Sequence, residues 1–162
     1  MSIQQGFIAK LFTSLLVASV TAIAQQPAEP APPKYNIELA ERLGADTYGM
    51  KLYVMAFLRK GPNRNQDSAT AAALQAAHLK NIGRMAMEGK LVVAGPFMED
   101  FDIRGIYIFN LRTVEEARAL TESDPAIKAG RLTMELHPWY GSAALMEVTR
   151  IHQTLEQKSI SK

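Results

Sequence analysis

The order of its apolar segments constrains the fold of this chain more than any other feature of the sequence. Two segments have the apolar spacing of amphipathic helices, residues 68–88 and 114–123. Four short apolar runs have the length of strands: residues 50–58, 90–97, 104–111 and 131–139. The resulting order of strand, helix, strand, strand, helix, strand predicts an α+β fold of the ferredoxin-like βαββαβ type, with two crossovers around a central antiparallel pair.

Local signals predict where the two helices begin and end. Gly89 follows the first helix and is the residue type that most often ends one. Thr113 and Glu116 have the spacing of a capping box at the start of the second helix. Asp124 precedes Pro125, and a residue before proline avoids the helical region, so the second helix is expected to close there.

Two helices can cover only one face of a four-stranded sheet. Tyr53, Met55 and Phe57 alternate along the first strand and are expected to face away from the helices, together with one full set of side chains on the third strand. A bare apolar face of this kind predicts a partner. A second copy meeting sheet to sheet is the simplest partner, so the sequence predicts a homodimer.

The first 24 residues are expected to form a secretory signal peptide. Lys10 supplies the basic start, residues 11–20 form a short apolar run, and Ala22-Ile23-Ala24 has the small residues of a cleavage site. The chain would then act in the periplasm or after secretion, without a membrane once the signal is cleaved. An uncleaved anchor is the alternative, although the apolar run is short for a membrane span.

The rest of the 162-residue chain divides by composition, and its 48% hydrophobic content suits one globular core. Proline and alanine dominate a segment that is expected to be an extended linker, and a short helix is expected to follow it. The expected parts are a Pro/Ala-rich linker at residues 25–34, a lead-in helix at 35–47, one compact domain at 48–145 and a polar C-terminal tail at 146–162.

Charge and cysteine content exclude several classes of protein. Without Lys10, 17 basic residues balance 16 acidic ones, which is no footprint for nucleic acid or an anionic membrane. The chain has no cysteine, which excludes disulfides, thiolate catalysis and cysteine-based metal sites. The sequence contains neither a phosphate-binding glycine loop nor a Gly-x-Ser-x-Gly motif.

The candidate site begins with a histidine on the first predicted helix. Leu74, His78, Ile82 and Met85 recur at spacings of four, four and three residues, which places His78 on the face that packs against the sheet. Such a histidine is either a buried neutral side chain held by one hydrogen bond or a general acid/base. The second role needs a carboxylate that orients the ring and stabilises its charged form.

Asp124 is a candidate for that carboxylate, because both helices lie on the same face of the predicted sheet. A negative charge at the C-terminal end of the second helix interacts unfavourably with the helix dipole. This indicates a compensating partner, although it does not show that the partner is His78. The alternative is an aspartate that simply ends a helix before proline.

Four segments together resemble the YCII-related (YciI-like) family: YGMKLYVMAFLRKGPN, HLKNIGRMAMEGKLVVAGPF, RGIYIFNLRTVEEARAL and SDPAIKAGRLTMELHPWYGSAAL. The resemblance covers residues 48–145 and implies a dimeric α+β barrel built from ferredoxin-like subunits. It also implies a histidine–aspartate dyad in a cleft. The histidine of the HL…EGK…AGP motif falls on His78, and the aspartate of the DP…AG motif falls on Asp124.

The resemblance also suggests positions for a substrate pocket. Gly95 and Pro96 match the AGP motif, in which glycine permits close approach of the backbone and proline ends strand pairing. Four more side chains are candidate walls of the cleft: Arg59, Arg104, Trp139 and Tyr140.

No metal or cofactor is expected from the remaining histidines. His137 and His152 have neither the i, i+4 spacing nor the carboxylate cluster that is typical of a metal site. Haem stays an alternative because related barrels bind it, although haem needs an axial histidine that faces an apolar cavity.

The favoured hypothesis is a small-molecule enzyme in which His78 is the general acid/base and Asp124 orients it, in a cleft near the dimer interface. Isomerase-like or lyase-like chemistry on a small cyclic or carbonyl compound suits a dyad without a metal or nucleophile, and a peroxidase-like reaction is suggested for some relatives. One alternative is a non-catalytic periplasmic ligand-binding or assembly subunit with the same barrel. In another alternative, these residues only determine the fold of a dimer and have no role in binding or catalysis.

Overall fold

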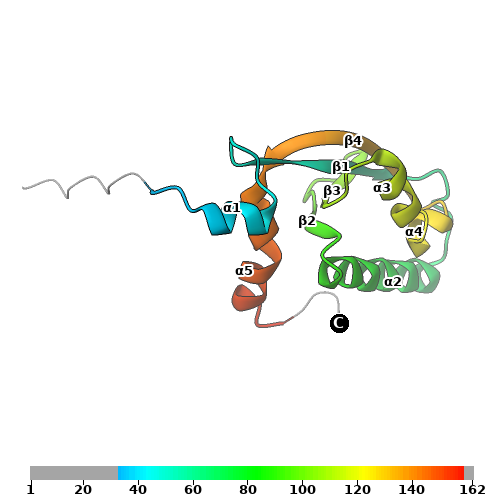
Figure 1. Cartoon of the computed structure of the whole chain (residues 1–162). Coiled ribbons are helices and arrows are strands. Elements are labelled where there is room, and N and C mark those ends of the chain that lie inside the picture. The colour runs from blue at the N-terminus through cyan, green and yellow to red at the C-terminus, as the bar shows by residue number, and fades with distance from the viewer. Residues whose placement is uncertain (1–32, 159–162) are drawn as a thin grey trace, which may run out of the picture. The chain divides into compact units, whose positions relative to one another are not determined.

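The computed structural model describes residues 33–158, and its main element is a four-stranded sheet (Figure 1). In sheet order the strands are β2 (Leu91–Pro96), β3 (Ile103–Phe109), β1 (Met50–Lys60) and β4 (Leu132–Ser142). All neighbouring strands are antiparallel. The predicted mixed α+β class is confirmed, and the four-stranded antiparallel sheet is compatible with a ferredoxin-like fold.

The predictions for the N-terminal part fall largely outside the described residues. This applies to the signal peptide at residues 1–24 and to all but the last two residues of the linker. The first described helix is α1 (Ile37–Leu43), which begins after the Asn36 cap. Among residues 33–158, no helix combines the length and the apolar composition needed to cross a membrane.

The two predicted long helices form, and their capping residues explain their starts. Helix α2 (Ser68–Met87) begins at Asp67, whose side chain accepts a hydrogen bond from the backbone N–H of Thr70. Gly89 follows this helix with a φ of 67°, a backbone conformation that glycine adopts without strain. Helix α3 (Val114–Thr121) begins with the predicted capping box, in which both reciprocal hydrogen bonds are present.

Helices α2 and α3 cover one face of the sheet and form the main core with it. Every second residue of β1 points to this face, as the alternation of a strand requires. The buried core residues are Val54, Ala56, Leu58, Met85, Leu91, Tyr107, Phe109 and Ala117. Removal of this apolar surface from water is the main force that holds the helices on the sheet.

The opposite face of the sheet is partly covered by the segment that follows β4. There, Leu145 and Met146, in the 3₁₀ helix η1 (Ala143–Glu147), pack on a second buried cluster of Tyr53, Val92 and Ile108. Only 1% of the Tyr53 surface is exposed, so the prediction of a bare face is wrong at this residue.

The chain covers this end of the face because it turns back over the sheet after β4. Met55 and Phe57 do face away from α2 and α3, as predicted, and they are only partly buried. Helix α5 (Val148–Leu155) follows η1 in the segment that the sequence indicated as a polar tail.

Candidate functional site

Helix α2 presents His78 to the sheet-facing side of the fold. Leu74 and Ile82, one helical turn before and after it, are partly buried on the same face, and Met85 is part of the main core. Only 6% of the His78 surface is exposed. The predicted orientation of this side chain is therefore found in the structure.

Asp124 occupies a different position in its helix from the one that the sequence indicated. Helix α3 ends at Thr121, and Asp124 is the N-cap of a separate short helix, α4 (Pro125–Lys128). Its Oδ1 accepts hydrogen bonds from the backbone N–H groups of Ala126, at 2.9 Å, and Ile127, at 3.4 Å. The expected unfavourable interaction with a helix C-terminus is wrong, because a carboxylate at an N-cap is stabilised by these N–H groups.

The structure brings His78 and Asp124 into direct contact. Nδ1 of His78 lies 2.9 Å from Oδ2 of Asp124, and the Asn81 side-chain amide donates to the same oxygen at 2.9 Å. Only 1% of the Asp124 surface is exposed. The pair therefore forms a buried, charge-assisted hydrogen bond.

Two opposing effects act on the pKa of Asp124. Burial has the largest effect and raises the pKa, because a charged carboxylate loses hydration. The hydrogen bonds from His78 and Asn81, the positive charge of a protonated His78 and the Ala126 N–H all favour the charged form and together outweigh burial, so the pKa lies below its ordinary value. Asp124 is consequently ionised at neutral pH, and its Oδ2 accepts a hydrogen bond from the Nδ1–H group of His78.

The other ring nitrogen of His78 faces a buried tyrosine. The Tyr107 hydroxyl, from β3, lies 3.1 Å from Nε2, and the two rings are nearly parallel with an interplanar angle of 18°. Burial, and secondly the negative charge of Asp124, raise the pKa of Tyr107 far above its ordinary value. The hydroxyl therefore keeps its proton. Because the ionised Asp124 carboxylate can only accept, Nδ1 carries the hydrogen of a neutral His78 ring, and Nε2 is then the acceptor for the Tyr107 hydroxyl.

The sequence reasoning missed two members of this network. Asn81 lies three residues after His78, so a search for polar side chains at helical spacing would have found it. Tyr107 has the same parity in β3 as the core residue Phe109, which places it on the face that meets α2. A tyrosine in an otherwise apolar strand also needs a hydrogen-bond partner for its buried hydroxyl, which would have indicated a polar side chain nearby.

Three of the predicted pocket walls lie on the other side of the sheet from the His78–Asp124 pair. Arg59 has the same parity in β1 as Tyr53, and Trp139 packs against the Tyr53 ring in the second cluster. Arg104 alternates with Gly105 and Tyr107, so it also points away from α2. The structure does not bring these side chains together with His78, and their role in binding stays a prediction.

The two arginines are held in ion pairs around the β2–β3 connection. Arg59 contacts Asp102 at 2.6 Å and Glu135 at 2.8 Å, and Arg104 contacts Asp100 at 2.6 Å. Ion pairs this exposed contribute little to stability, but they orient the guanidinium groups.

Gly95 and Pro96 end strand β2. The sequence predicted that glycine at this point would let another part of the backbone approach closely. A side chain at Gly105, opposite them in β3, would lie 2.5 Å from the Gly95 carbonyl oxygen. The close approach is therefore present, although the residue that needs to be glycine for it is Gly105. Whether Gly95 and Pro96 contact a substrate stays a prediction.

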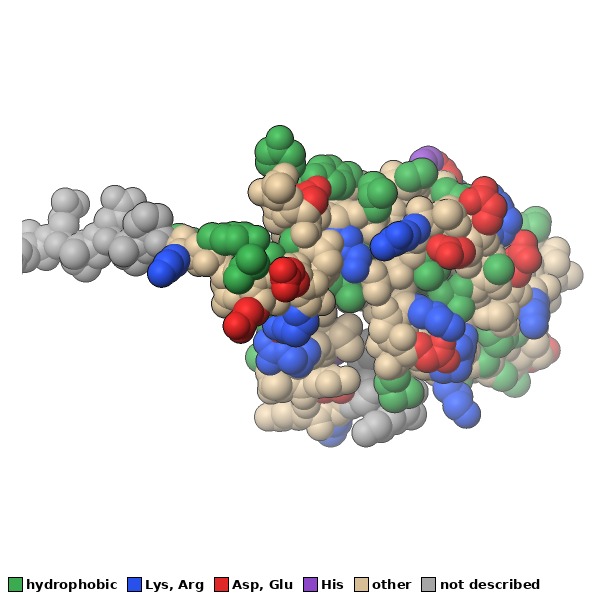
Figure 2. Space-filling model, in the orientation of Figure 1, with side chains coloured by type: hydrophobic (Ala, Val, Ile, Leu, Met, Phe, Trp, Pro, Cys, Tyr) green, Lys and Arg blue, Asp and Glu red, His purple; other side chains and the backbone are tan. Residues whose placement is uncertain are grey.

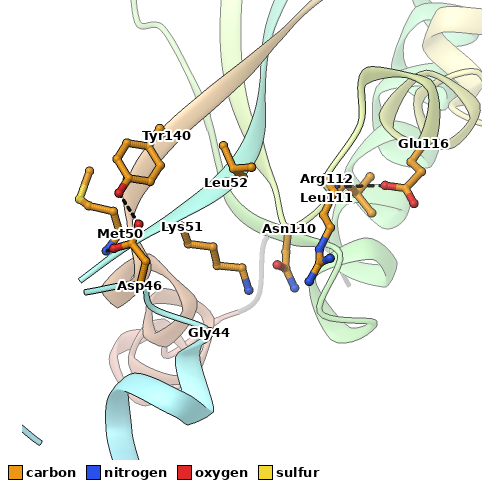
Figure 3. Close-up of a pocket in the computed structure, with 10 residues that line it drawn as sticks. All are labelled: Gly44, Asp46, Met50, Lys51, Leu52, Asn110, Leu111, Arg112, Glu116 and Tyr140. Atoms are coloured by element: carbon orange, nitrogen blue, oxygen red, sulfur yellow. Dashed lines mark hydrogen bonds between the residues drawn. The ribbon is translucent and has the colours of Figure 1, made fainter. Parts of the chain in front are cut away.

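A pocket of about 750 Å³ opens at a different place, beside the first residues of β1, the segment that follows β3 and the end of β4 (Figure 3). Tyr140 is the predicted wall residue that lines it, and its hydroxyl donates to the Asp46 carboxylate. Neither His78 nor Asp124 lines this pocket or the smaller one beside Leu120. In the described part of the chain, the acid/base pair and this pocket are thus separate.

Comparison with protein families identifies the domain. The model of the YCII-related domain matches residues 53–139, which is more than half of the chain. The chain belongs to the YCII-related family. The match contains both His78 and Asp124, together with Asn81 and Tyr107.

Two further comparisons accompany this YCII-related assignment. No curated protein matches the sequence. A solved structure of 5-chloro-2-hydroxyhydroquinone dehydrochlorinase from Burkholderia phenoliruptrix AC1100, in complex with 2,5-dihydroxybenzoquinone, is similar to this chain at 24% sequence identity and a TM-score of 0.41. The similarity covers 55% of this chain and 93% of that one.

The YCII-related domain holds one buried acid/base pair, and its other described histidines lie apart from it. Among residues 33–158, no three His, Asp or Glu side chains lie close enough together to hold a metal ion. His137 contacts Glu135 at 2.8 Å on the edge strand, and His152 lies 3.8 Å from Glu156 in α5. Chemically, the His78 ring can accept a proton at Nε2 while Asp124 stabilises the charge that forms.

Proposed function

We propose that this YCII-related domain is a small-molecule enzyme in which His78 and Asp124 act as a general acid/base dyad. The observation that carries the proposal is the buried hydrogen bond between His78 Nδ1 and Asp124 Oδ2. A buried charge is costly, and here five polar contacts converge to hold two ionisable groups in one geometry. Arrangements of this kind are over-represented at functional sites.

The dyad would work through the proton balance of the imidazole ring. Asp124 holds the hydrogen on Nδ1, so Nε2 carries the free electron pair and takes a proton from a carbon or hydroxyl of the substrate. The imidazolium that forms is stabilised by the Asp124 carboxylate. Return of the same proton to another atom of the substrate completes an isomerisation, and its return to a leaving group completes an elimination.

Tyr107 controls access to the reactive nitrogen in this mechanism. Its hydroxyl occupies the hydrogen-bonding position at Nε2, and only 2% of its surface is exposed. A substrate therefore reaches Nε2 after the hydroxyl moves aside, or it exchanges a proton through that hydroxyl. On the first route Tyr107 only limits access to Nε2, and on the second it is part of the proton path.

The proposed active form is a homodimer that acts after export, in the periplasm or outside the cell. Support for the dimer comes from Met55 and Phe57, which are apolar and only partly buried on the face away from α2 and α3. Sheet-to-sheet pairing of two copies would bury them and form a dimeric α+β barrel. Light scattering on the full chain tests this, and a stable monomer at micromolar concentration contradicts it.

A non-catalytic binding or assembly subunit is the second candidate, and one observation favours it. His78 and Asp124 are nearly sealed, and neither of them lines either of the two pockets described above. Under this alternative the pair would only stabilise the fold, and no substrate would exchange protons with it.

Proton exchange with solvent separates the two candidates. A panel of small carbonyl and hydroxyaromatic compounds is incubated with the full chain in D₂O, and deuterium incorporation is followed by NMR. We expect the wild type to catalyse exchange of one class of compound and His78→Gln to lose about 100-fold or more of that rate. His137→Gln, which removes an exposed histidine, is the control and keeps the rate.

The outcome is decisive when the variant is folded. A His78→Gln chain with the circular dichroism spectrum and the exchange rate of the wild type refutes the dyad. A wild-type chain that exchanges none of the compounds, although it binds one of them, supports the non-catalytic subunit.

A further inference from the structure

The pocket at the start of β1 contains two cationic side chains that pair with no carboxylate of residues 33–158. Lys51 and Arg112 both line it, and among the described residues neither forms an ion pair with a carboxylate. Figure 3 shows the two side chains extending into the same space, with Asn110 between them. Figure 2 shows basic side chains beside a hollow on this face of the molecule.

The two carboxylates in the pocket lining are already engaged by other groups. Asp46 accepts hydrogen bonds from the Tyr140 hydroxyl and from the backbone N–H groups of Tyr48 and Met50. These bonds lower the pKa of Asp46, the one from Tyr140 most strongly. Asp46 is therefore ionised, yet its charge is used in a local turn and not to balance Lys51.

Glu116 is engaged in the same way at the start of α3. Its Oε2 accepts from the backbone N–H groups of Arg112 and Thr113 as part of the capping box. The contact to residue 112 is thus made to its backbone and leaves the guanidinium group without a carboxylate partner among the described residues.

The surroundings of Lys51 indicate what is missing. Burial, and secondly the positive charge of Arg112, lower the pKa of Lys51. Its Nζ makes one long hydrogen bond, 3.4 Å to the Leu43 carbonyl oxygen. Two like charges that face one pocket repel each other, and an anion placed between them would remove that repulsion and add two charge-assisted hydrogen bonds.

We propose that this pocket binds a small organic carboxylate, with its anionic group between Lys51 and Arg112. An arginine offers a planar pair of donors that matches a carboxylate, and a lysine adds a point charge. The other walls include Leu52, Leu111 and the Tyr140 ring, which suit an apolar or aromatic body. A volume of about 750 Å³ lies within the range of pockets for small ligands.

This site is separate from His78 and Asp124, so it does not depend on the proposed acid/base function. Loss of catalysis in a His78 variant leaves the prediction of carboxylate binding unchanged. Failure to bind a carboxylate in turn leaves the dyad untouched.

The test uses three probes that separate charge from shape. Benzoate carries the charge and the apolar body, benzamide has the body without the charge, and inorganic phosphate has the charge without the body. Each is titrated into the ¹⁵N-labelled full chain and followed by NMR. We expect benzoate to shift the backbone amides of Gly44, Lys51, Asn110 and Arg112, and to bind at least tenfold more tightly than benzamide and phosphate.

Variants then assign the charge. The double variant Lys51→Met with Arg112→Met is expected to weaken benzoate binding at least tenfold. Arg112→Lys keeps the charge and is expected to retain part of the affinity for benzoate. The matched control is Lys80→Met with Arg118→Met, which removes the same charges from exposed positions outside the pocket lining and leaves the affinity unchanged.

Each outcome bears on the proposal. Equal affinities for benzoate and benzamide refute an anionic site, and this comparison needs no variant. Tighter binding of phosphate than of benzoate refutes the organic carboxylate. Shifted amides confined to other parts of the chain, or a folded Lys51/Arg112 double variant with wild-type affinity, refute the location.

Discussion

Replacement of Asp124 by Asn tests the buried network most directly, because it removes the charge and keeps the shape. In the wild type, Oδ1 caps α4 and Oδ2 accepts from both His78 and Asn81. The new amide keeps its oxygen toward the Ala126 N–H and places its NH₂ group where Oδ2 was. That group cannot accept a hydrogen bond, so the Asn81 amide loses its partner. His78 can bond to the new NH₂ group only if its Nδ1 carries no hydrogen and acts as the acceptor.

The expected loss of stability follows from these contacts. A hydrogen bond to a charged group contributes about 1.5–3 kcal/mol, and the bond from Asn81 is lost outright. The bond from His78 is exchanged for a weaker neutral one after a change of tautomer, at a cost of roughly 0.5–1 kcal/mol. Since the pKa of Asp124 is lowered despite burial, the charged form is stabilised on balance, and we expect Asp124→Asn to lose about 2–4 kcal/mol.

Urea denaturation at pH 7 and a fixed protein concentration measures this loss. Glu122→Gln is the matched control, because it makes the same chemical change at an exposed neighbouring position and should stay within about 0.5 kcal/mol of the wild type. If Asp124→Asn is as stable as Glu122→Gln, the network does not hold the fold in the way described.

The pH dependence has a definite sign. The pKa of Asp124 is lower in the folded chain than its ordinary value of 3.8, so the unfolded chain binds the proton more readily. The stabilisation is complete above the ordinary pKa and is lost as the pH falls through the lower folded pKa. Other carboxyls with lowered pKa values contribute to the acid slope of both proteins, so the measurement is the difference between the slopes of wild type and Asp124→Asn below about pH 5.

Three further substitutions test separate parts of the structure by the same denaturation assay. Tyr107→Phe leaves His78 Nε2 as a buried acceptor without a donor and should cost about 1–3 kcal/mol. Gly130→Ala should cost about 2 kcal/mol, because the residue has a φ of 67° and a Cβ would lie 2.6 Å from the Asn63 amide nitrogen. Thr113→Ala removes the capping box of α3 and should cost about 1 kcal/mol. A variant as stable as the wild type contradicts the contact that it removes.

The elements of the sheet and the long helices could be predicted because their signals are local. Apolar spacing distinguishes residues 68–88 from the strands on either side, and the capping box at Thr113 identifies a helix start without tertiary information. Strand parity also placed Met55 and Phe57 correctly. Burial of Tyr53 could not be predicted in this way, since it depends on a return of the chain after β4 that no local pattern encodes.

The error at Asp124 has a physical cause in the length of α4. Four residues make about one helical turn, which is too short to show any apolar periodicity. The sequence Asp124-Pro125 is compatible with the end of one helix and with the start of another, because proline is favoured in the first turn. The N-cap interpretation would have predicted a stabilised carboxylate directly.

The placement of the pocket walls could have been predicted from parity alone. Arg59 lies two residues after Phe57 in β1, so it points to the same face as Phe57 and away from α2. His78 reaches the sheet from the α2 side. A single cleft formed by both residues in one chain was therefore incompatible with the strand alternation that the same sequence predicted.

The buried network is closed, and that closure separates a structural from a catalytic role. Among the described residues, no buried side-chain nitrogen or oxygen lacks a partner, and the position at His78 Nε2 is filled by the Tyr107 hydroxyl. A purely structural network is most stable when it stays closed, whereas a general base must release this hydroxyl whenever a substrate proton arrives. Tyr107→Phe removes the competing donor, so a lower stability combined with a changed pH profile of exchange indicates proton transfer at Nε2. A lower stability with no exchange in either protein indicates that the dyad serves the fold.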